Sequence, residues 1–192
     1  LRDGDDGAIQ PSVVGDATYD RRFALPMGQQ ANLRLDAHSQ YRTSSDSLTD
    51  SNGDGIIDGR DQSHLTLTGD WQATGILQNG MALSGMAEVQ AASYWISQDA
   101  TYAGQTSRLT GALATELRWP FSRSTAAGTD VLDPVVQLIW SPDSLSQIPN
   151  EDSTLVEFDE GNLFSLSRFS GSDAYERGVR VNLGGTFTHI AP

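Results

Sequence analysis

The sequence predicts an all-β chain that forms an antiparallel segment of a transmembrane β-barrel, with about seven or eight long strands. Three observations lead to this fold class. Apolar and polar residues alternate with a period of two over several long runs, no helical period of useful length is present, and short and long connections alternate between the runs. We expect residues 1–192 to be one partial barrel domain, excerpted from a longer protein.

The first two runs, 9–19 and 31–42, alternate along their whole length. In the second run Leu33 and Leu35 occupy one set of positions, while Arg34 and other polar residues occupy the other set. Because successive side chains of a strand point to opposite faces, each run has one apolar face and one polar face. Both runs are therefore predicted to be strands between an apolar and a polar environment.

The third and fourth runs, 65–77 and 81–96, are separated by the dipeptide Asn79-Gly80. Asparagine and glycine tolerate the positive φ angles that a two-residue hairpin turn requires. The sequence therefore predicts a hairpin of two long antiparallel strands.

Three further runs cover 106–121, 134–141 and 175–188. The last has the sharpest alternation, with Val179 and Val181 among its apolar positions and no large apolar residue on the opposite face. The run at 134–141 is shorter and alternates less cleanly. All three are predicted to be strands.

The predicted connections differ in length in a regular way. A membrane barrel has short periplasmic turns and longer extracellular loops, and all connections except the fifth follow this rule. In chain order they are short at 25–30, long at 43–62, tight at 79–80, medium at 98–105, medium at 122–133 and long at 142–173.

Strand length favours a membrane barrel over a soluble β-sandwich, which would also show alternation. Strands of soluble proteins average about five or six residues, whereas several runs here exceed the roughly ten residues that cross a bilayer. Aromatic residues near the strand ends suit the interfacial girdles of a barrel. These residues are Tyr41, Trp95, Trp119, Phe121 and Trp140.

Composition excludes some classes of function. The formal net charge is -13, with 25 acidic and 12 basic residues, and this argues against nucleic acid as a partner. No cysteine is present, so neither disulfides nor thiolate metal sites hold the chain together. An acidic surface instead attracts divalent cations.

The first long loop contains the segment DSNGDGIIDGRD, which has the spacing of a calcium-binding loop. Oxygen donors stand at positions 1, 3, 5, 7, 9 and 12, and Gly55 stands at position 6, where such loops bend sharply. We therefore predict calcium as a cofactor; a solvated turn rich in Asp and Gly is the alternative. The predicted ligands are Asp50, Asn52, Asp54, Ile56 through its carbonyl, Asp58 and Asp61.

No catalytic motif accompanies these features, and the chain is predicted not to be an enzyme. His38, His64 and His189 lie on separate predicted strands without metal-ligand spacing. There is no serine nucleophile elbow, no phosphate-binding loop and no zinc-binding His-Glu motif.

The segment 148–178 combines aromatic, amide and paired charged residues in an irregular stretch. Its order of residues resembles a long loop of the LptD family, the lipopolysaccharide-assembly proteins in the outer membrane of Gram-negative bacteria. About 50 residues carry the specific likeness, and the rest fits only as barrel strands. The matched residues are Pro149, Asn150, Glu151, Asp152, Ser153, Asp159, Asn162, Leu163, Phe164, Arg168, Phe169, Gly171, Asp173, Glu176, Gly178 and Arg180.

The resemblance implies a large barrel of which this chain supplies only some strands, so that the isolated segment should be a curved open sheet with two bare edges. It implies transport of lipopolysaccharide to the outer leaflet of the outer membrane, after delivery by a periplasmic bridge, and a lipoprotein plug inside the lumen. Residues on the polar face would line the hydrophilic path or contact the plug. They are Arg34, Asp36, Arg108, Glu116, Arg118, Glu176 and Arg180.

Opposite charges gather where the long loop meets the last predicted strand. The residues are Arg168, Asp173, Glu176, Arg177 and Arg180, and their pairing is expected to fix the fold of the loop at the barrel mouth. Leu163, Phe164 and Phe169 would then pack the loop inward over the lumen.

Two other functions fit part of the pattern. One is a soluble secreted β-domain that binds a partner or a glycan through a calcium-ordered loop, and the other is a general diffusion porin. The match of residues 148–178 to a lipopolysaccharide-assembly loop argues against the porin.

Overall fold

The computed structural model describes residues 7–102, 104–143, 148–151, 161–169 and 171–191, which form one antiparallel sheet of eight strands. No α-helix occurs in these residues, so none is long and apolar enough to cross a membrane. The strands are β1 (Pro11–Ala24), β2 (Gln30–Arg42), β3 (Asp61–Ile76), β4 (Ala82–Ser97), β5 (Gly104–Arg118), β6 (Phe121–Thr125), β7 (Gly128–Ser141) and β8 (Gly178–Ile190).

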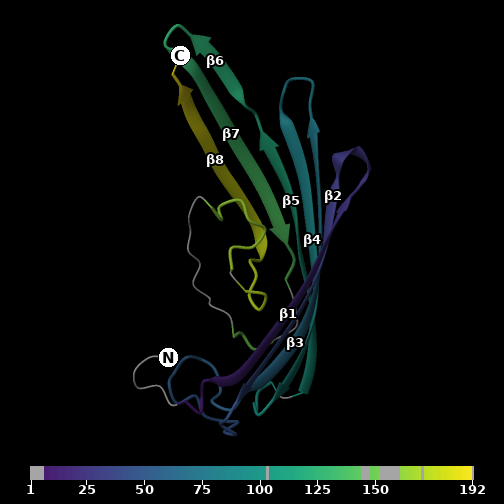
Figure 1. Ribbon diagram of the computed structural model, residues 1–192, viewed down its shortest axis with the longest axis vertical. Helices are drawn as coiled ribbons and strands as arrows, with labels where there is room; N and C mark the ends of the chain where they lie inside the picture. The colour runs from purple at the N-terminus through teal and green to yellow at the C-terminus, as the bar shows by residue number, and fades with distance from the viewer. Residues whose placement is uncertain (1–6, 103, 144–147, 152–160, 170, 192) are drawn as a thin grey trace.

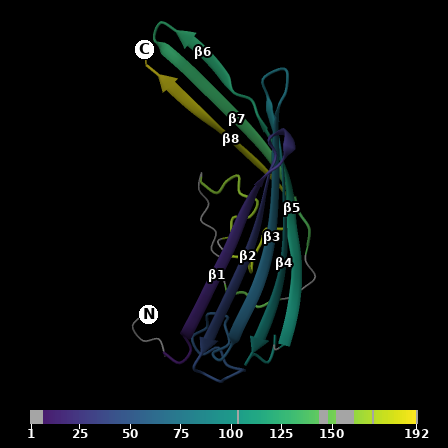
Figure 2. The same ribbon diagram turned by 45° about the vertical axis from the view of Figure 1, so that its right-hand side comes forward.

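Figures 1 and 2 show that the sheet is open and curved, with β1 at one margin and β8 at the other. Strands β1 to β5 pair in chain order, and β7 pairs with β5, β6 and β8. Seven of the eight strands have 13 to 16 residues, and β6 has five. This arrangement confirms the predicted all-β class and the open form expected of an isolated barrel segment.

Short turns lie at one end of the sheet and the longer loops at the other (Figure 1). The turn between β1 and β2 is a single 3₁₀ turn, η1 (Pro26–Gly28). In the turn between β3 and β4, Leu77 donates its backbone N–H to the Met81 carbonyl at 2.8 Å, and Gly80 has a φ of 80°. The glycine is needed there because other residues rarely adopt that conformation.

The prediction of a medium loop at 122–133, the fifth connection, is wrong. The structure replaces it with a hairpin in which β6 pairs with the first residues of β7 around a tight turn at 126–127. β6 also continues β5 along the same edge of β7, because Leu113 pairs with Trp140 and Phe121 pairs with Leu132 in one register. The interruption lies at Pro120, which has no N–H to donate. The alternation of short and long connections is therefore complete.

One face of the sheet is apolar and open to the surroundings. We call it the outer face. Large apolar side chains on every long strand are exposed there, as a lipid-facing surface requires. Examples are Val13, Tyr19, Leu35, Leu67, Val89, Leu109, Leu138, Val181 and Phe187.

The opposite, polar face is concave and carries the core of the protein. Its buried apolar side chains come from β4, β5 and β7, and they lie beneath the long loop that joins β7 to β8. Buried polar residues such as Gln62, Gln137 and Asn182 share this face. The core is therefore made by a loop seated on a sheet, and not by two packed sheets.

Candidate functional site

The long loop between β7 and β8 lies against the polar face of the sheet (Figures 1 and 2). Apolar side chains of the described loop residues reach the two buried clusters of the sheet. Ile148 packs against the cluster around Tyr94, and Leu166 packs against the cluster around Ile139. Because few apolar groups make the contact, polar interactions hold most of the loop in place.

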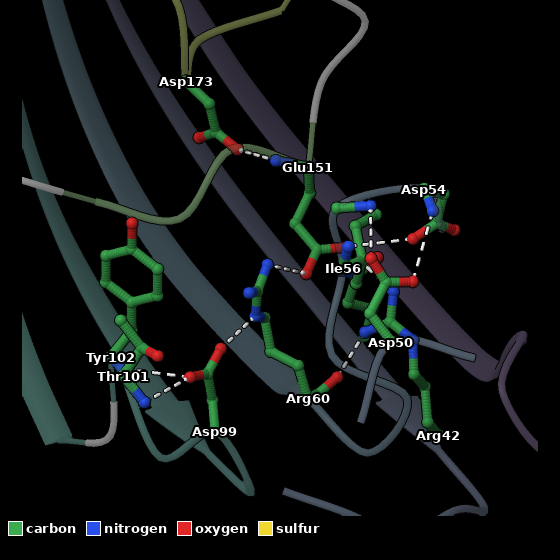
Figure 3. Close-up of polar contacts among 12 residues, drawn as sticks. Arg42, Asp50, Asp54, Ile56, Arg60, Asp99, Thr101, Tyr102, Glu151 and Asp173 are labelled. Carbon is green, nitrogen blue, oxygen red and sulfur yellow. Dashed lines mark hydrogen bonds and ion pairs between the residues drawn. The ribbon is translucent and has the colours of Figure 1, made fainter. Parts of the chain in front are cut away.

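Glu151 is the centre of the first polar cluster (Figure 3). Its carboxylate lies 2.9 Å from Arg42 at the end of β2 and 3.3 Å from Arg60 just before β3. Gln40 donates a further hydrogen bond to it at 2.6 Å. The side chains of Glu151, Arg42 and Arg60 are only 10%, 4% and 3% exposed, so this is a buried ion cluster.

Arg60 extends the cluster to the loop between β4 and β5. Its Nε lies 2.5 Å from a carboxylate oxygen of Asp99, which also accepts backbone N–H groups of Thr101 and Tyr102 (Figure 3). Burial raises the pKa of Asp99, but the hydrogen bonds from Arg60 and the two backbone groups outweigh it and leave the pKa below its ordinary value. Three loops at the same end of the sheet are thereby joined.

Asp173 forms the second contact of the loop with the sheet. The Tyr94 hydroxyl donates to one of its carboxylate oxygens at 3.0 Å, and the Glu151 backbone N–H donates to the other at 3.0 Å. The guanidinium of Arg108, on β5, donates to the backbone carbonyls of Ser172 and Asp173. Arg108 is 5% exposed, so the loop covers it almost completely.

Glu176 organises the junction between the loop and β8. Its carboxylate accepts from Arg168 Nε at 2.9 Å and pairs with Arg180, and Arg180 also donates to the Leu166 carbonyl. Burial raises the pKa of Glu176, but the hydrogen bond from Arg168 and the charge of Arg180 together lower it below its ordinary value. Arg177 instead lies over the Tyr175 ring, 5.4 Å from its centroid.

Acid is expected to loosen this junction. Because the pKa of Glu176 is lowered in the folded state, its ion pairs stabilise the loop above the ordinary pKa and lose that effect as pH falls through the lowered pKa. The protection of residues 161–169 against hydrogen exchange, measured relative to the rate of a free amide at the same pH, should therefore fall between about pH 5 and pH 3. Glu176→Gln should exchange faster at neutral pH and show a flatter pH profile; a profile equally steep in both proteins would contradict this.

The Phe164 ring lies close to the backbone of β8 at Gly184. A Cβ atom on Gly184 would lie 2.9 Å from the Phe164 ring, so a larger residue there would displace the ring. Gln137 donates to the Phe164 carbonyl at 2.9 Å, and Asn182 donates to Gln137 at 2.8 Å. Side chains of β7 and β8 thus fix the middle of the loop.

A cavity of about 550 Å³ remains between the loop and the sheet. Its lining is mainly polar, with hydroxyl, amide and charged side chains from β2 to β5 and aromatic rings from the loop. The Thr66 hydroxyl, on a residue only 1% exposed, lines it and has no hydrogen-bond partner among the described residues. The space therefore suits water or a hydrophilic group.

The residues predicted to face a lumen lie on the polar face of their strands, except Glu176, which belongs to the loop. Arg34 and Asp36 line the cavity, and Arg108 is covered by the loop. Further along β5, Arg118 forms one ion pair with Glu116 at 3.4 Å and a second with Asp133 at 2.7 Å. What these residues do toward a substrate or a plug stays a prediction.

The residues matched to the family loop fall into three groups. Some contact the sheet directly, as described above for Glu151, Phe164 and Asp173. Others shape the loop: Pro149 is fully buried, and the Asn162 carbonyl accepts from Ser165 at 3.1 Å. Asn150, Leu163, Phe169 and Gly171 are half-buried, and Gly178 has a φ of 82° at the start of β8. The third group, Asp152, Ser153 and Asp159, lies outside the described residues.

The last strand begins later than the alternation predicts. Tyr175 and Glu176 were expected on a strand from 175, but β8 starts at Gly178. The Tyr175 hydroxyl instead donates to the Pro142 carbonyl at 2.9 Å, and Arg108 lies over its ring. Both residues therefore belong to the loop.

The calcium-type segment forms a compact turn before β3. Asp50 accepts backbone N–H groups from Gly53, Asp54 and Gly55 at 2.8 to 3.2 Å, and Asp58 accepts one from Ser51. Figure 3 shows Asp50, Asp54 and Ile56 in this turn.

The last predicted ligand is held elsewhere. Asp61 is the first residue of β3, where its two oxygens accept from the Arg42 backbone N–H and from Gln98. Among the described residues, no three His, Cys, Asp or Glu side chains are grouped so that they can hold a metal ion. Calcium binding at the six predicted donors stays a prediction.

Calcium should protect this loop from proteolysis if the prediction is right. Limited digestion with a protease that cleaves after acidic residues should cut within 50–58 more slowly in millimolar calcium than with a chelator. Asp54→Ala should remove the difference, and cleavage at equal rates in both conditions would disprove calcium binding.

Arg60, Asp99, Gln40 and Tyr94 hold the loop or its anchors, but the sequence did not single them out. Arg60 and Asp99 stand in polar loop stretches where charged residues are ordinary. Their partners lie 39 and 91 residues away in the chain. A local pattern contains no signal for such pairs.

Comparison with known proteins gives one match, to a family. No curated protein matches the chain. The sequence model of one family, described as LptD, LPS transport system D, matches residues 8–191, which is nearly the whole chain. The open antiparallel sheet, the apolar outer face and the loop seated on the polar face agree with that match, and the chain belongs to the LptD family.

Proposed function

We propose that this chain forms part of the outer-membrane translocon that inserts lipopolysaccharide into the outer leaflet. The family is a lipopolysaccharide transport component of the outer membrane. The observation that carries the proposal is the loop on the polar face: in this barrel segment of the family, the described loop residues 148–151, 161–169 and 171–177 lie against the polar face and are held there by buried ion pairs.

The two faces of the sheet suit a substrate with a saccharide part and an acyl part. The polar face offers hydroxyls, amides and charges to hydrated sugars and phosphates, while the middle of the outer face offers apolar contact to acyl chains. The sheet is open at β1 and β8, so further strands of the same protein would complete the wall between these environments.

Two kinds of partner follow from the family likeness and remain part of the proposal. One is a lipoprotein plug that occupies the lumen, and the other is the periplasmic bridge that delivers lipopolysaccharide. The charged residues of the polar face, Arg34 and Asp36 above all, stand where a plug or a passing saccharide would meet the wall.

Charge reversal on the polar face tests the proposal. Cells that depend on full-length protein carrying Arg34→Glu and Asp36→Arg should show at least a severalfold loss of newly made lipopolysaccharide at the surface, or of co-purifying lipoprotein. Equal amounts of folded protein in the outer membrane are the required control. Export and co-purification both at the wild-type level would overturn the proposal.

A further inference from the structure

The outer face carries charged side chains only near its two ends, as far as the described strands show. At the long-loop end there is Asp61, which is hydrogen bonded to Arg42. At the short-turn end there are Arg21 on β1 and a row across β6, β7 and β8. The row consists of Arg123, Asp130 and His189.

The row is a defined cluster. Arg123 lies 2.8 Å from one carboxylate oxygen of Asp130, and His189 Nδ1 lies 2.8 Å from the other. Asp130 is 21% exposed, whereas Arg123 is 77% exposed, so most guanidinium N–H groups of Arg123 remain open to the surroundings. Gly128 leaves room for the imidazole, since a Cβ there would lie 3.0 Å from His189 Cε1.

Both outward arginines adjoin aromatic rings of the outer face. The Arg21 guanidinium lies over the Phe23 ring, 5.3 Å from its centroid. Arg123 is two residues from Phe121, whose ring packs against Trp119 at 4.9 Å between centroids. Rings followed by cations are typical of the level at which a membrane protein leaves the hydrocarbon and enters the headgroups.

The distance along β7 between Trp140 and Asp130 supports the placement of these charges at the level of the lipid headgroups. Trp140, near the long-loop end, and Asp130 are ten residues apart on the same face. At about 3.4 Å per residue they are about 34 Å apart along the strand. A strand tilt of about 35 to 45° reduces this to about 24 to 28 Å across the membrane, close to the roughly 25 Å apolar band of a barrel.

We propose that Arg21 and the Arg123, Asp130 and His189 cluster bind the phosphates of anionic glycerophospholipids in the leaflet at the short-turn side. Guanidinium groups match phosphate oxygens in geometry as well as charge. Asp130 positions Arg123 and His189, and most guanidinium donors of Arg123 stay open to the surroundings. The inference rests on the placement in the outer membrane and not on lipopolysaccharide transport.

Retention of lipids by the full-length protein in detergent tests the site. Native mass spectrometry would compare bound phosphatidylglycerol with phosphatidylcholine after exposure to an equal mixture. The wild type should prefer phosphatidylglycerol, and each of Arg21→Gln and Arg123→Gln should lower the preference about fivefold. The single variants and their combination are measured separately, so that failure of one to insert leaves the test intact.

Arg22→Gln is the matched control, because Arg22 is 86% exposed at the same end of β1 but belongs to the polar face. It should keep the wild-type preference. An unchanged preference in the Arg21 and Arg123 variants, or an equal loss in Arg22→Gln, would overturn the lipid site. Release of phosphatidylglycerol from the wild type by about 10 mM inorganic phosphate would assign the cluster to a soluble anion, and would also overturn it.

Discussion

Glu151→Gln is expected to free residues 148–151 from the sheet and to expose the loop to solvent. The change removes the negative charge that faces both Arg42 and Arg60, which are 4% and 3% exposed. Breaking a buried ion pair on one side costs about 3 to 5 kcal/mol, but Arg60 keeps Asp99, so we expect about 2 to 3 kcal/mol. Hydrogen exchange in this segment should accelerate about 30- to 150-fold.

Glu116→Gln is the control for this prediction. Glu116 lies on the same face of the sheet and pairs with Arg118, and it makes no ion pair with the loop residues that the structure describes. Its replacement should leave exchange in 148–151 unchanged. Equal exchange in Glu151→Gln and the wild type would show that Glu151 does not hold the loop.

Arg108→Met is expected to release the other side of the loop. The substitution keeps an unbranched apolar stem but removes the guanidinium and with it the donors to the Ser172 and Asp173 carbonyls. Hydrogen bonds from a charged group contribute about 1.5 to 3 kcal/mol each, so the local loss should reach at least about 2 kcal/mol. Exchange should increase in 171–177 more than in 161–169, where the junction ion pair of Glu176 remains.

Arg118→Met is the matched control on the same strand and the same face. Arg118 is 43% exposed and pairs with Asp133 and Glu116, away from the loop. It should not change exchange in 171–177. If both methionine variants behaved alike, the buried contacts of Arg108 with the loop would not be its main anchor on this side.

The strands were predictable because each separates two environments. Apolar residues are required at alternate positions wherever a strand faces hydrocarbon, and this holds for most of β1 to β5, β7 and β8. The prediction failed at 122–133, because the outer positions there carry Arg123 and Asp130. Where a strand leaves the apolar band, nothing requires an apolar residue, and the period of two disappears although the backbone pairing continues.

The site was only partly predictable, for a different reason. Arg168, Glu176 and Arg180 lie close together in the sequence, so their opposite charges predicted the ion pairs that the structure shows where the loop joins β8. The Glu151 cluster joins residues about a hundred positions apart, and its partners become visible only when the hairpins bring three loops to one end. The calcium spacing is local too. Its last donor, Asp61, accepts a hydrogen bond at the start of β3, and calcium binding stays a prediction.

The seat of the loop on the polar face is tested most directly by a cysteine pair in intact cells. These 192 residues contain no cysteine, so Leu166→Cys with Ala114→Cys introduces the one thiol pair of this segment, and peptide mapping after mild oxidation identifies a cross-link between the two positions. Leu166→Cys with Leu113→Cys is the control, because Leu113 is the neighbouring residue of β5 on the outer face and is 53% exposed. The account predicts a cross-link in the first pair and none in the second. Absence of a cross-link in the first pair, or cross-links in both, would contradict a loop held inside the barrel wall.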